Sequence, residues 1–230
     1  INIKIPNKGD LLSYIWIDLG SDTVGGTEIA ADTTAPASFE LWIGGQMIDR
    51  QDAFYMVQLW QKFLLDSSAK GFATIPTSDD TATTLTTFIT AKWLPLHFFF
   101  CDSYGLPLVA LQYNEVEIRI NYAGGDPSGY KYYANYVVLD TDERAMFVNK
   151  DHEILIEQIQ RVTVNQNITA TFQDVSFDLN LLNHPVKCLL WGNPSSSGSS
   201  NLTTSNVQIY LNGTEMFGSV MPDPFFTQVQ

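Results

Sequence analysis

Hydrophobic and polar positions alternate over many short stretches of this chain, a pattern typical of β-strands. The clearest stretch is residues 106–120 (LPLVALQYNEVEIRI), which begins as a near-continuous apolar run and ends in strict alternation. This switch predicts a strand that is buried on both faces at first and then has one face in solvent. The same kind of pattern predicts further strands at 10–19, 39–43, 94–100, 132–139, 154–164, 175–181, 184–191 and 207–211.

Residues 51–65 change to a helical period, because their apolar side chains recur three and four positions apart with polar side chains opposite. We therefore expect one short helix inserted among the strands, and a second, charged helical connector at 140–150. Polar loops rich in Gly, Ser and Thr separate these elements, and Asn212-Gly213 has the residues of a type I′ hairpin turn. Many short strands at turn-separated intervals favour a β-sandwich or jelly roll.

Two strand-and-turn stretches, 39–48 and 207–216, share an alternating strand, a glycine turn and a polar–apolar pair. Internal duplication and chance explain this similarity equally well, so the sequence does not decide whether the chain contains an internal repeat.

Composition narrows the function classes. The 230 residues carry a net charge of −13, from 12 basic and 25 acidic side chains. So acidic a chain repels phosphate backbones, and we expect no direct contact with nucleic acid. No apolar run reaches the roughly 18 residues that span a bilayer, so no transmembrane segment is expected. Cys101 and Cys188 stand far apart beside apolar neighbours, which predicts small buried side chains rather than a disulfide.

Residues capable of catalysis or metal binding do not form a recognisable set. His97, His152 and His184 are far apart in sequence and include no His-x-His pair, so we expect no metal and no cofactor. Glu115 and Glu117 lie side by side on one strand next to Arg119, whereas glycoside hydrolysis needs two carboxylates that face each other across a bond. The sequence therefore predicts an exposed strand face and no enzyme.

Other polar and aromatic residues have simpler explanations. Asn167, Asn201 and Asn212 stand in Asn-x-Ser/Thr triplets and are possible glycosylation sites, of which Asn201 is predicted to be the most accessible. The apolar surroundings of four tryptophans predict core packing rather than a carbohydrate site; these are Trp42, Trp60, Trp93 and Trp191.

Taken in order, several strings resemble the major capsid proteins of nucleocytoplasmic large DNA viruses, the double jelly-roll group that includes chlorella viruses and iridoviruses. These strings are 5–12 (IPNKGDLL), 41–49 (LWIGGQMID), 106–118 (LPLVALQYNEVEI), 139–144 (LDTDER), 152–158 (HEILIEQ), 184–187 (HPVK), 211–213 (LNG) and 226–230 (FTQVQ). The most specific is 106–118, called the signature segment below. Its matching residues are Leu106, Pro107, Leu108, Ala110, Leu111, Gln112, Tyr113, Glu115, Val116, Glu117 and Ile118.

The resemblance implies an all-β fold, a double jelly roll made of two antiparallel eight-stranded β-sandwiches with a short inserted helix. Residues 1–149 would form the first jelly roll, with its helix at about 51–65. Residues 150–230 would form a connector and the N-terminal part of a second jelly roll, which we expect to be incomplete in this chain because the family continues further.

The same resemblance implies a structural role. Three copies would form a pseudo-hexagonal capsomer, and capsomers would tile an icosahedral shell in contact with neighbouring capsomers and minor capsid proteins. The protein would then be found in the virion, after assembly in the host cytoplasm. The fold class alone leaves a lectin-like, carbohydrate-binding jelly roll as the alternative, and a metal-dependent cupin enzyme as a more distant one.

Overall fold

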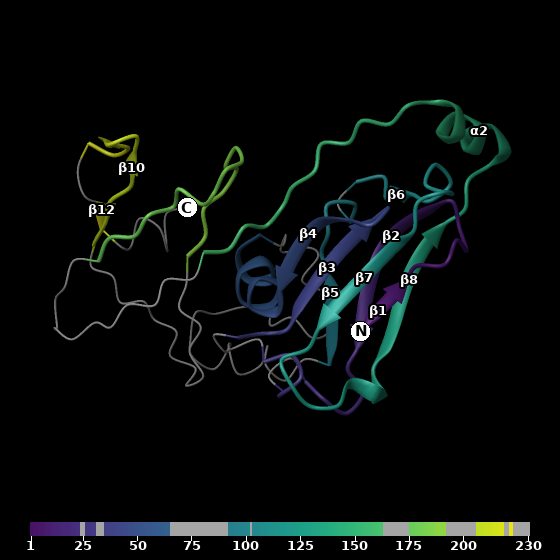
Figure 1. Ribbon diagram of the computed structural model, residues 1–230, viewed down its shortest axis with the longest axis horizontal. Helices are drawn as coiled ribbons and strands as arrows, with labels where there is room; N and C mark the ends of the chain where they lie inside the picture. Colours follow the sequence, from purple (N-terminus) through teal and green to yellow (C-terminus); the bar gives the residue numbers. More distant parts are fainter. Residues whose placement is uncertain are drawn as a thin grey trace.

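A computed structural model describes residues 1–23, 26–30, 35–64, 92–101, 103–162, 175–191, 206–218 and 221–222. Two four-stranded antiparallel sheets form the body of the molecule (Figure 1). The protein is mostly β with little helix in this part of the chain. The described residues include no helix long and apolar enough to cross a membrane.

Sheet A has the strand order β1-β7-β3-β4. Its strands are β1 (Asn2–Lys4), β7 (Val116–Asn121), β3 (Ser38–Ile43) and β4 (Gln46–Asp52). A glycine turn joins β3 to β4, with Gly44 at φ 57° and Gly45 at φ 81°, as the sequence predicted for the end of β3. Glycine reaches this left-handed region without a steric penalty.

Sheet B is built around β2 (Leu11–Asp18). Along one side of β2 lie β5 (Trp93–Leu96) and the short β6 (Leu106–Pro107), and along the other lies β8 (Lys131–Val137). The predicted strand at 94–100 is therefore shorter, because residues 97–100 turn away after β5.

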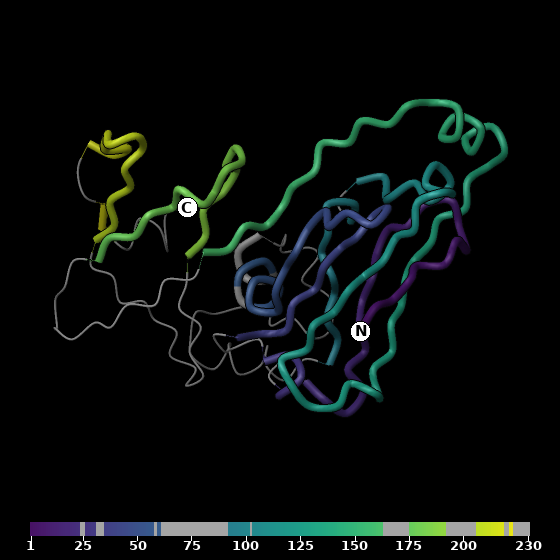
Figure 2. Tube along the Cα trace, in the orientation of Figure 1, coloured from purple at the N-terminus to yellow at the C-terminus, as the bar shows by residue number. Residues whose placement is uncertain are grey.

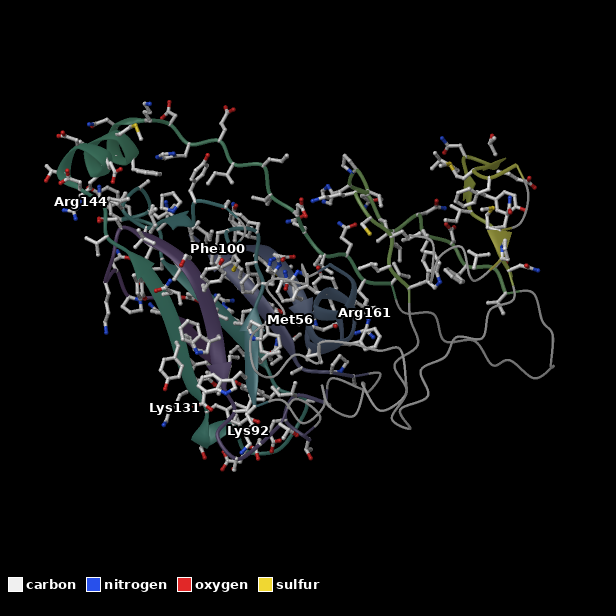
Figure 3. The ribbon with its side chains drawn as sticks, turned by 180° about the vertical axis from the view of Figure 1, so that it is seen from behind. Met56, Lys92, Phe100, Lys131, Arg144 and Arg161 are labelled. Carbon is white, nitrogen blue, oxygen red and sulfur yellow. The ribbon has the colours of Figure 1, made fainter. Side chains whose placement is uncertain are left out.

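One hydrophobic core joins the two sheets, because alternate residues of their strands point to the same interior. In β7, for example, Val116, Ile118 and Ile120 are buried, whereas Glu117 and Arg119 are only partly covered. Met56 and Phe100 lie within this core, at the places labelled in Figure 3, and both are completely buried.

The inserted helix is a π-helix, η1 (Tyr55–Leu64). It begins later than the predicted residue 51, because residues 51 and 52 complete β4. Asp52 Oδ1 accepts the backbone N–H of Tyr55 over 2.8 Å and so caps the first turn. Trp60 stacks on His97 with ring centroids 4.1 Å apart, which holds the helix against the end of β5.

After β8 the chain enters α2 (Thr141–Asn149), the predicted charged connector helix. Asp140 and Glu143 form a capping box at its N-terminus. A short 3₁₀ turn (Pro127–Gly129), capped by Asp126, precedes β8. From α2 the backbone runs back along the body toward β4 and η1 (Figure 2).

The remaining predicted strands are largely wrong. No strand occurs at 154–162, 175–181 or 184–191, and many of their side chains are exposed. An alternating pattern needs a partner strand, and these residues have none within the described chain. The predicted strand 207–211 is broken into short pairs: β9 (Asn206–Val207) with β12 (Met221–Pro222), and β10 (Tyr210–Leu211) with β11 (Thr214–Glu215).

The predicted hairpin turn is confirmed. Asn212 (φ 50°) and Gly213 (φ 76°) both have positive φ and join β10 to β11. This pair of positive φ angles is the requirement of a type I′ turn.

Candidate assembly surfaces

The signature segment crosses from one sheet to the other. Leu106 and Pro107 pair with β2 in sheet B, whereas Val116 begins β7 in sheet A. Between them the backbone makes successive turns, with Leu111 N–H donating to Leu108 O over 3.0 Å and Asn114 N–H to Leu111 O over 2.8 Å. The prediction of one continuous strand over 106–120 is therefore wrong.

The pattern change in this segment has a different cause. Its buried part, Leu106 to Leu108, enters the core from sheet B. Ala110, Gln112, Tyr113 and Glu115 are exposed on the turn, and alternation resumes once β7 pairs in sheet A.

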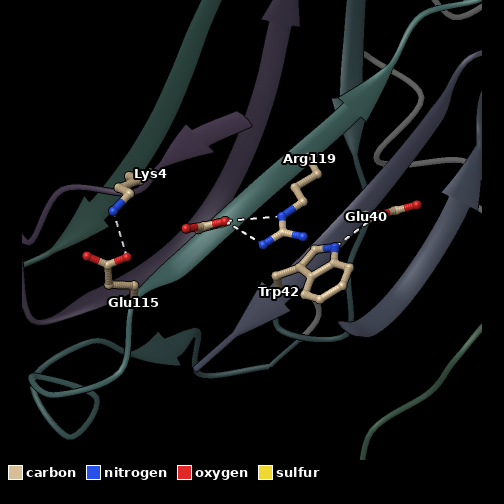
Figure 4. A network of polar contacts seen from close by, with 6 residues as sticks. Lys4, Glu40, Trp42, Glu115 and Arg119 are labelled. Atoms are coloured by element: carbon tan, nitrogen blue, oxygen red, sulfur yellow. Dashed lines mark hydrogen bonds and ion pairs between the residues drawn. The ribbon is translucent and has the colours of Figure 1, made fainter. Parts of the chain in front are cut away.

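A ladder of charged and aromatic side chains covers the outer face of sheet A (Figure 4). Arg119 donates twice to Glu117 Oε2, at 3.1 Å from each nitrogen, as its position next to that carboxylate predicted. Its guanidinium also lies 3.7 Å from the ring centroid of Trp42, whose Nε1 donates to Glu40 over 2.9 Å. These contacts pair the Glu117 carboxylate with a cation and stack that cation on an aromatic ring.

Glu115 is paired on the same side of the molecule. Lys4 Nζ donates to Glu115 Oε2 over 2.7 Å, and this hydrogen bond raises the pKa of Lys4. Both side chains are about two-thirds exposed, so the pair contributes little to stability.

The outer face of sheet B is aromatic. Trp16 and Tyr133, directly opposite on β2 and β8, stack with centroids 5.5 Å apart, and Trp93 approaches Tyr133 at 6.5 Å. Tyr14 and Trp93 are 53% and 44% exposed. The prediction that Trp93 is a core residue is therefore wrong, because the alternation of β5 points it outward, away from Leu94 and Leu96.

The connector segment, residues 150–162, returns to the edge strand of sheet A. Ile159 N–H donates to Asp49 Oδ1 over 3.0 Å, and Gln158 bonds to the carbonyl of Ile48. Arg161 forms an ion pair with Asp52. The connector thereby covers part of β4, whose outer edge has no partner strand within the described chain.

Asp49 is a buried acid at this contact, with 3% of its surface exposed. Burial raises the pKa of its carboxyl, although the N–H of Ile159, the amide of Gln51 and the N–H of Arg50 oppose this shift. Gln51 Nε2 donates to Asp49 Oδ2 over 2.7 Å and also to the carbonyl of His97 over 2.6 Å. The group is a structural junction, because the bonds to Ile159 and to His97 tie β4 to two segments that are distant in sequence.

A second junction fixes α2. Arg144 Nε lies 2.8 Å from Asp10 Oδ1, and its NH2 donates to Asp10 Oδ2 over 3.0 Å. Leu139 N–H donates to the same Oδ2 over 2.8 Å. These bonds, that of Arg144 first, lower the pKa of Asp10. Arg144 and Asp10 also line an open pocket of about 290 Å³ with Asn7, Lys8, Gly9 and Val138.

The structure describes one of the predicted glycosylation sites. Asn212 is exposed on the β10–β11 turn, where its modification stays a prediction. Asn167 and Asn201 lie outside the described residues.

The potential metal ligands and thiols stay apart. Among the described residues, no three His, Cys, Asp or Glu side chains are placed to hold a metal ion. Cys101 is buried as predicted, whereas Cys188 is exposed, because the predicted strand around it does not form.

Sequence reasoning missed Asp10, Arg144 and Asp49. Arg144 and Asp10 are separated by 134 positions, and Asp49 and Ile159 by 110 positions. The sequence offers one signal for Asp49: a polar residue stands at an inward position of a strand, beside hydrophobic residues. Its distant partners alone explain why a polar residue is buried there.

These features define a class of protein: an antiparallel β-sandwich with polar or aromatic outer faces and no recognisable catalytic group among its described residues. The model of the major capsid protein N-terminus matches residues 1–127, so the chain belongs to the major capsid protein family. The resemblance to capsid proteins of nucleocytoplasmic large DNA viruses is thereby confirmed.

Individual relatives agree with this assignment. The major capsid protein of Pyramimonas orientalis virus is 30% identical over 247 residues, which cover 98% of this chain and 60% of the relative. That of Paramecium bursaria Chlorella virus 1 is 29% identical over 211 residues, covering 83% of this chain and 48% of the relative. The chain thus spans about half to three-fifths of the length of these relatives.

A structural neighbour extends the likeness to the fold. A quasi-atomic model of the PBCV-1 virus capsid matches with a TM-score of 0.62 at 22% identity, over 100% of this chain and 68% of that one. The neighbour is a double jelly-roll capsid, which supports that fold for this chain.

Proposed function

We propose that this protein is a shell-forming subunit of a large DNA virus, a homotrimer whose pseudo-hexagonal capsomers tile an icosahedral capsid. The observation that carries the proposal is the family match over residues 1–127, which includes all of sheet A and much of sheet B. Neighbouring capsomers and minor capsid proteins are the expected partners. The role is structural, without catalysis, cofactor or direct nucleic-acid binding, and the site of action is the virion after assembly in the host cytoplasm.

The proposal includes a division of the chain. Residues 1–149 make a first eight-stranded jelly roll with its inserted helix, and residues 150–230 make a connector and the beginning of a second. The shared hydrophobic core of β2, β3, β5 and β7 supports the first unit. Exposed apolar side chains beyond the connector, such as Leu181 and Leu211, support a second unit whose core needs further strands.

Assembly depends on the surfaces of the molecule rather than on a catalytic or ligand-binding site. Ion pairs such as Glu117–Arg119 keep the outer face of sheet A polar, and a β-sandwich with defined faces is a suitable building block for repeated contacts. The net charge of −13 keeps separate copies from associating until matched surfaces meet.

Oligomeric state tests the proposal. Full-length protein should sediment as a trimer at micromolar concentration, and particles viewed by electron microscopy should have three-fold outlines. A protein that stays monomeric across concentration and salt would overturn the assignment.

A further inference from the structure

The β10–β11 hairpin lies away from the two packed sheets (Figure 1). Residues 210–216 are all exposed, so no other element of the described chain covers either strand. Each strand pairs through two residues, and one further bond, from the N–H of Met216 to the carbonyl of Ile209 over 2.9 Å, extends the ladder. A hairpin of two strands is marginally stable on its own, so we expect its turn to open often.

The turn of this hairpin places a side-chain amide next to an unobstructed backbone nitrogen. Asn212 is exposed, and its amide forms no hydrogen bond within the described residues. Gly213 follows directly, and a Cβ built on it would meet nothing within 4 Å. Neither a side chain on residue 213 nor a packed neighbour therefore hinders a reaction between these two groups.

We propose that Asn212 is a site of deamidation through the backbone nitrogen of Gly213. This nitrogen loses its proton and attacks Cγ of Asn212, and the new C–N bond closes a cyclic imide. The bond from Cγ to Nδ2 breaks, and the side-chain nitrogen takes up a proton and leaves as ammonia. Water then opens the ring at either carbonyl, which leaves aspartate or isoaspartate at position 212.

Opening of the hairpin controls this reaction. Residues 212 and 213 have φ of 50° and 76°, the conformation that a type I′ turn requires while β10 and β11 are paired. Ring closure needs rotation about the backbone of Asn212, which takes the residue out of this turn. The rate should therefore follow how often the hairpin opens, and not the stability of the two sheets.

Asn180 provides a comparison within the same chain. It is exposed as well, but its Nδ2 donates to Asp178 Oδ2 over 2.6 Å, and its backbone N–H donates to Oδ1 of the same carboxylate over 2.9 Å. The residue that follows is Leu181, whose side chain obstructs the approach of the backbone nitrogen. We expect Asn180 to keep its amide.

Deamidation would change both the charge and the backbone of the hairpin. Each converted copy gains one negative charge on a chain of net charge −13. Isoaspartate also adds a methylene group to the main chain, so β10 and β11 no longer meet in the same register. A glycan on the Asn212 triplet would be attached to Nδ2, the nitrogen that leaves, so the two modifications exclude each other.

The full-length protein tests the proposal when it is made in bacteria, which leave this triplet unglycosylated. It is incubated at neutral and mildly alkaline pH, and peptide mass spectrometry measures aspartate while enzymatic methylation measures isoaspartate. Asn212 should convert progressively, and faster at higher pH because the attacking nitrogen must lose its proton. Gly213→Ala should slow the conversion severalfold, although it strains the turn, because the added methyl group obstructs the attack.

A synthetic peptide of residues 207–217 gives the rate for an open turn. If Asn212 of the folded protein stays unchanged while the peptide converts, the hairpin protects its amide and the proposal is overturned. Equal rates for wild type and Gly213→Ala, or conversion of Asn180 as fast as that of Asn212, would overturn it too, since the Gly213 nitrogen would then not be the cause. None of these outcomes depends on the oligomeric state, so the proposed function is tested separately.

Discussion

The backbone N–H of Ile159 donates to the carboxylate of Asp49 over 3.0 Å, which fixes the connector segment to an inward-facing side chain of β4. Asp49 also accepts from Gln51 and from the N–H of Arg50. One carboxylate therefore joins the edge strand to a segment more than a hundred positions away.

Replacing Asp49 by alanine should lower the free energy of unfolding by about 1–3 kcal/mol, because a partly buried donor on Ile159 and a buried donor on Gln51 lose this acceptor. Urea denaturation followed by circular dichroism measures the change. Asp49→Asn is the matched control, since its Oδ1 still accepts the N–H of Ile159, and its loss should be smaller. Equal losses in the two variants would contradict the role of the hydrogen bonds.

The raised pKa of Asp49 also predicts that the free energy of unfolding depends on pH. Burial raises the pKa of Asp49, so the folded state favours the neutral carboxyl more than the unfolded state does. This contribution to stability is fully present below the ordinary value of about 3.9 and is lost as the pH rises through the raised pKa. The stability difference between wild type and Asp49→Asn, measured in urea across this range, should change with pH; a constant difference would refute the prediction.

Comparing alanine substitutions at two glycines with positive φ distinguishes the cost of backbone strain from the cost of a steric clash. A Cβ at Gly105 (φ 92°) would lie 2.8 Å from the carbonyl oxygen of Leu12, whereas one at Gly45 (φ 81°) would meet nothing within 4 Å. Gly45→Ala should cost about 1 kcal/mol of unfolding free energy from strain, and Gly105→Ala at least about 1 kcal/mol more. Thermal or urea denaturation of both variants checks this, and equal losses would show that the approach to β2 does not matter.

The contact between Arg119 and Trp42 predicts a measurable coupling. The guanidinium lies 3.7 Å from the ring centroid, partly shielded from solvent. A double-mutant cycle with Arg119→Ala and Trp42→Leu should give a coupling of about 0.5–1 kcal/mol in unfolding free energy. The cycle of Lys4→Ala with Trp42→Leu should give a coupling near zero, because Lys4 pairs with Glu115 and Trp42 with Arg119 and Glu40. Similar values for both cycles would argue against the cation–π contact.

The pH at which the protein unfolds in acid should depend on the ion pair between Asp10 and Arg144. The pKa of Asp10 is lowered, so its stabilising contribution is present above about 3.9 and is lost as the pH falls through the lowered value. Arg144→Ala removes the main cause of that shift, and the midpoint of acid unfolding should move to higher pH when followed by circular dichroism. Lys8→Ala changes a neighbouring exposed cation and should leave the midpoint unchanged; an equal shift there would point to net charge instead.

The elements predicted correctly from the sequence are those whose local residue pattern agrees with their packing in the structure. β2, β3 and β8 alternate, pack on the same core and lie where expected. Helix α2 begins at a capping box, and the Asn212-Gly213 turn has the positive φ angles that its residues favour. These elements depend mainly on local chemistry, which periodicity and turn residues describe well.

Elements that depend on distant partners could not be predicted in this way. β4 was missed because its inward positions hold Asp49 and Gln51, and only the connector and His97 explain polar residues there. Residues 106–120 have the pattern of one strand, but their two ends pair in different sheets. Periodicity gives the buried positions of a segment and does not tell which sheet buries them.

The bonds of the connector to β4 lower the entropy cost of packing the later residues of the chain near sheet A. With residue 159 held by Asp49 and Arg161 paired with Asp52, the chain beyond residue 162 starts from the β4 edge rather than from the far end of α2. The tether, meaning the length of chain between the body and the later residues, is shortened by the connector. A shorter tether raises the effective concentration of the later segments near sheet A and lowers the loop-closure cost of their packing there. Loss of the Asp49 contact would therefore slow the docking of residues far from any substituted position.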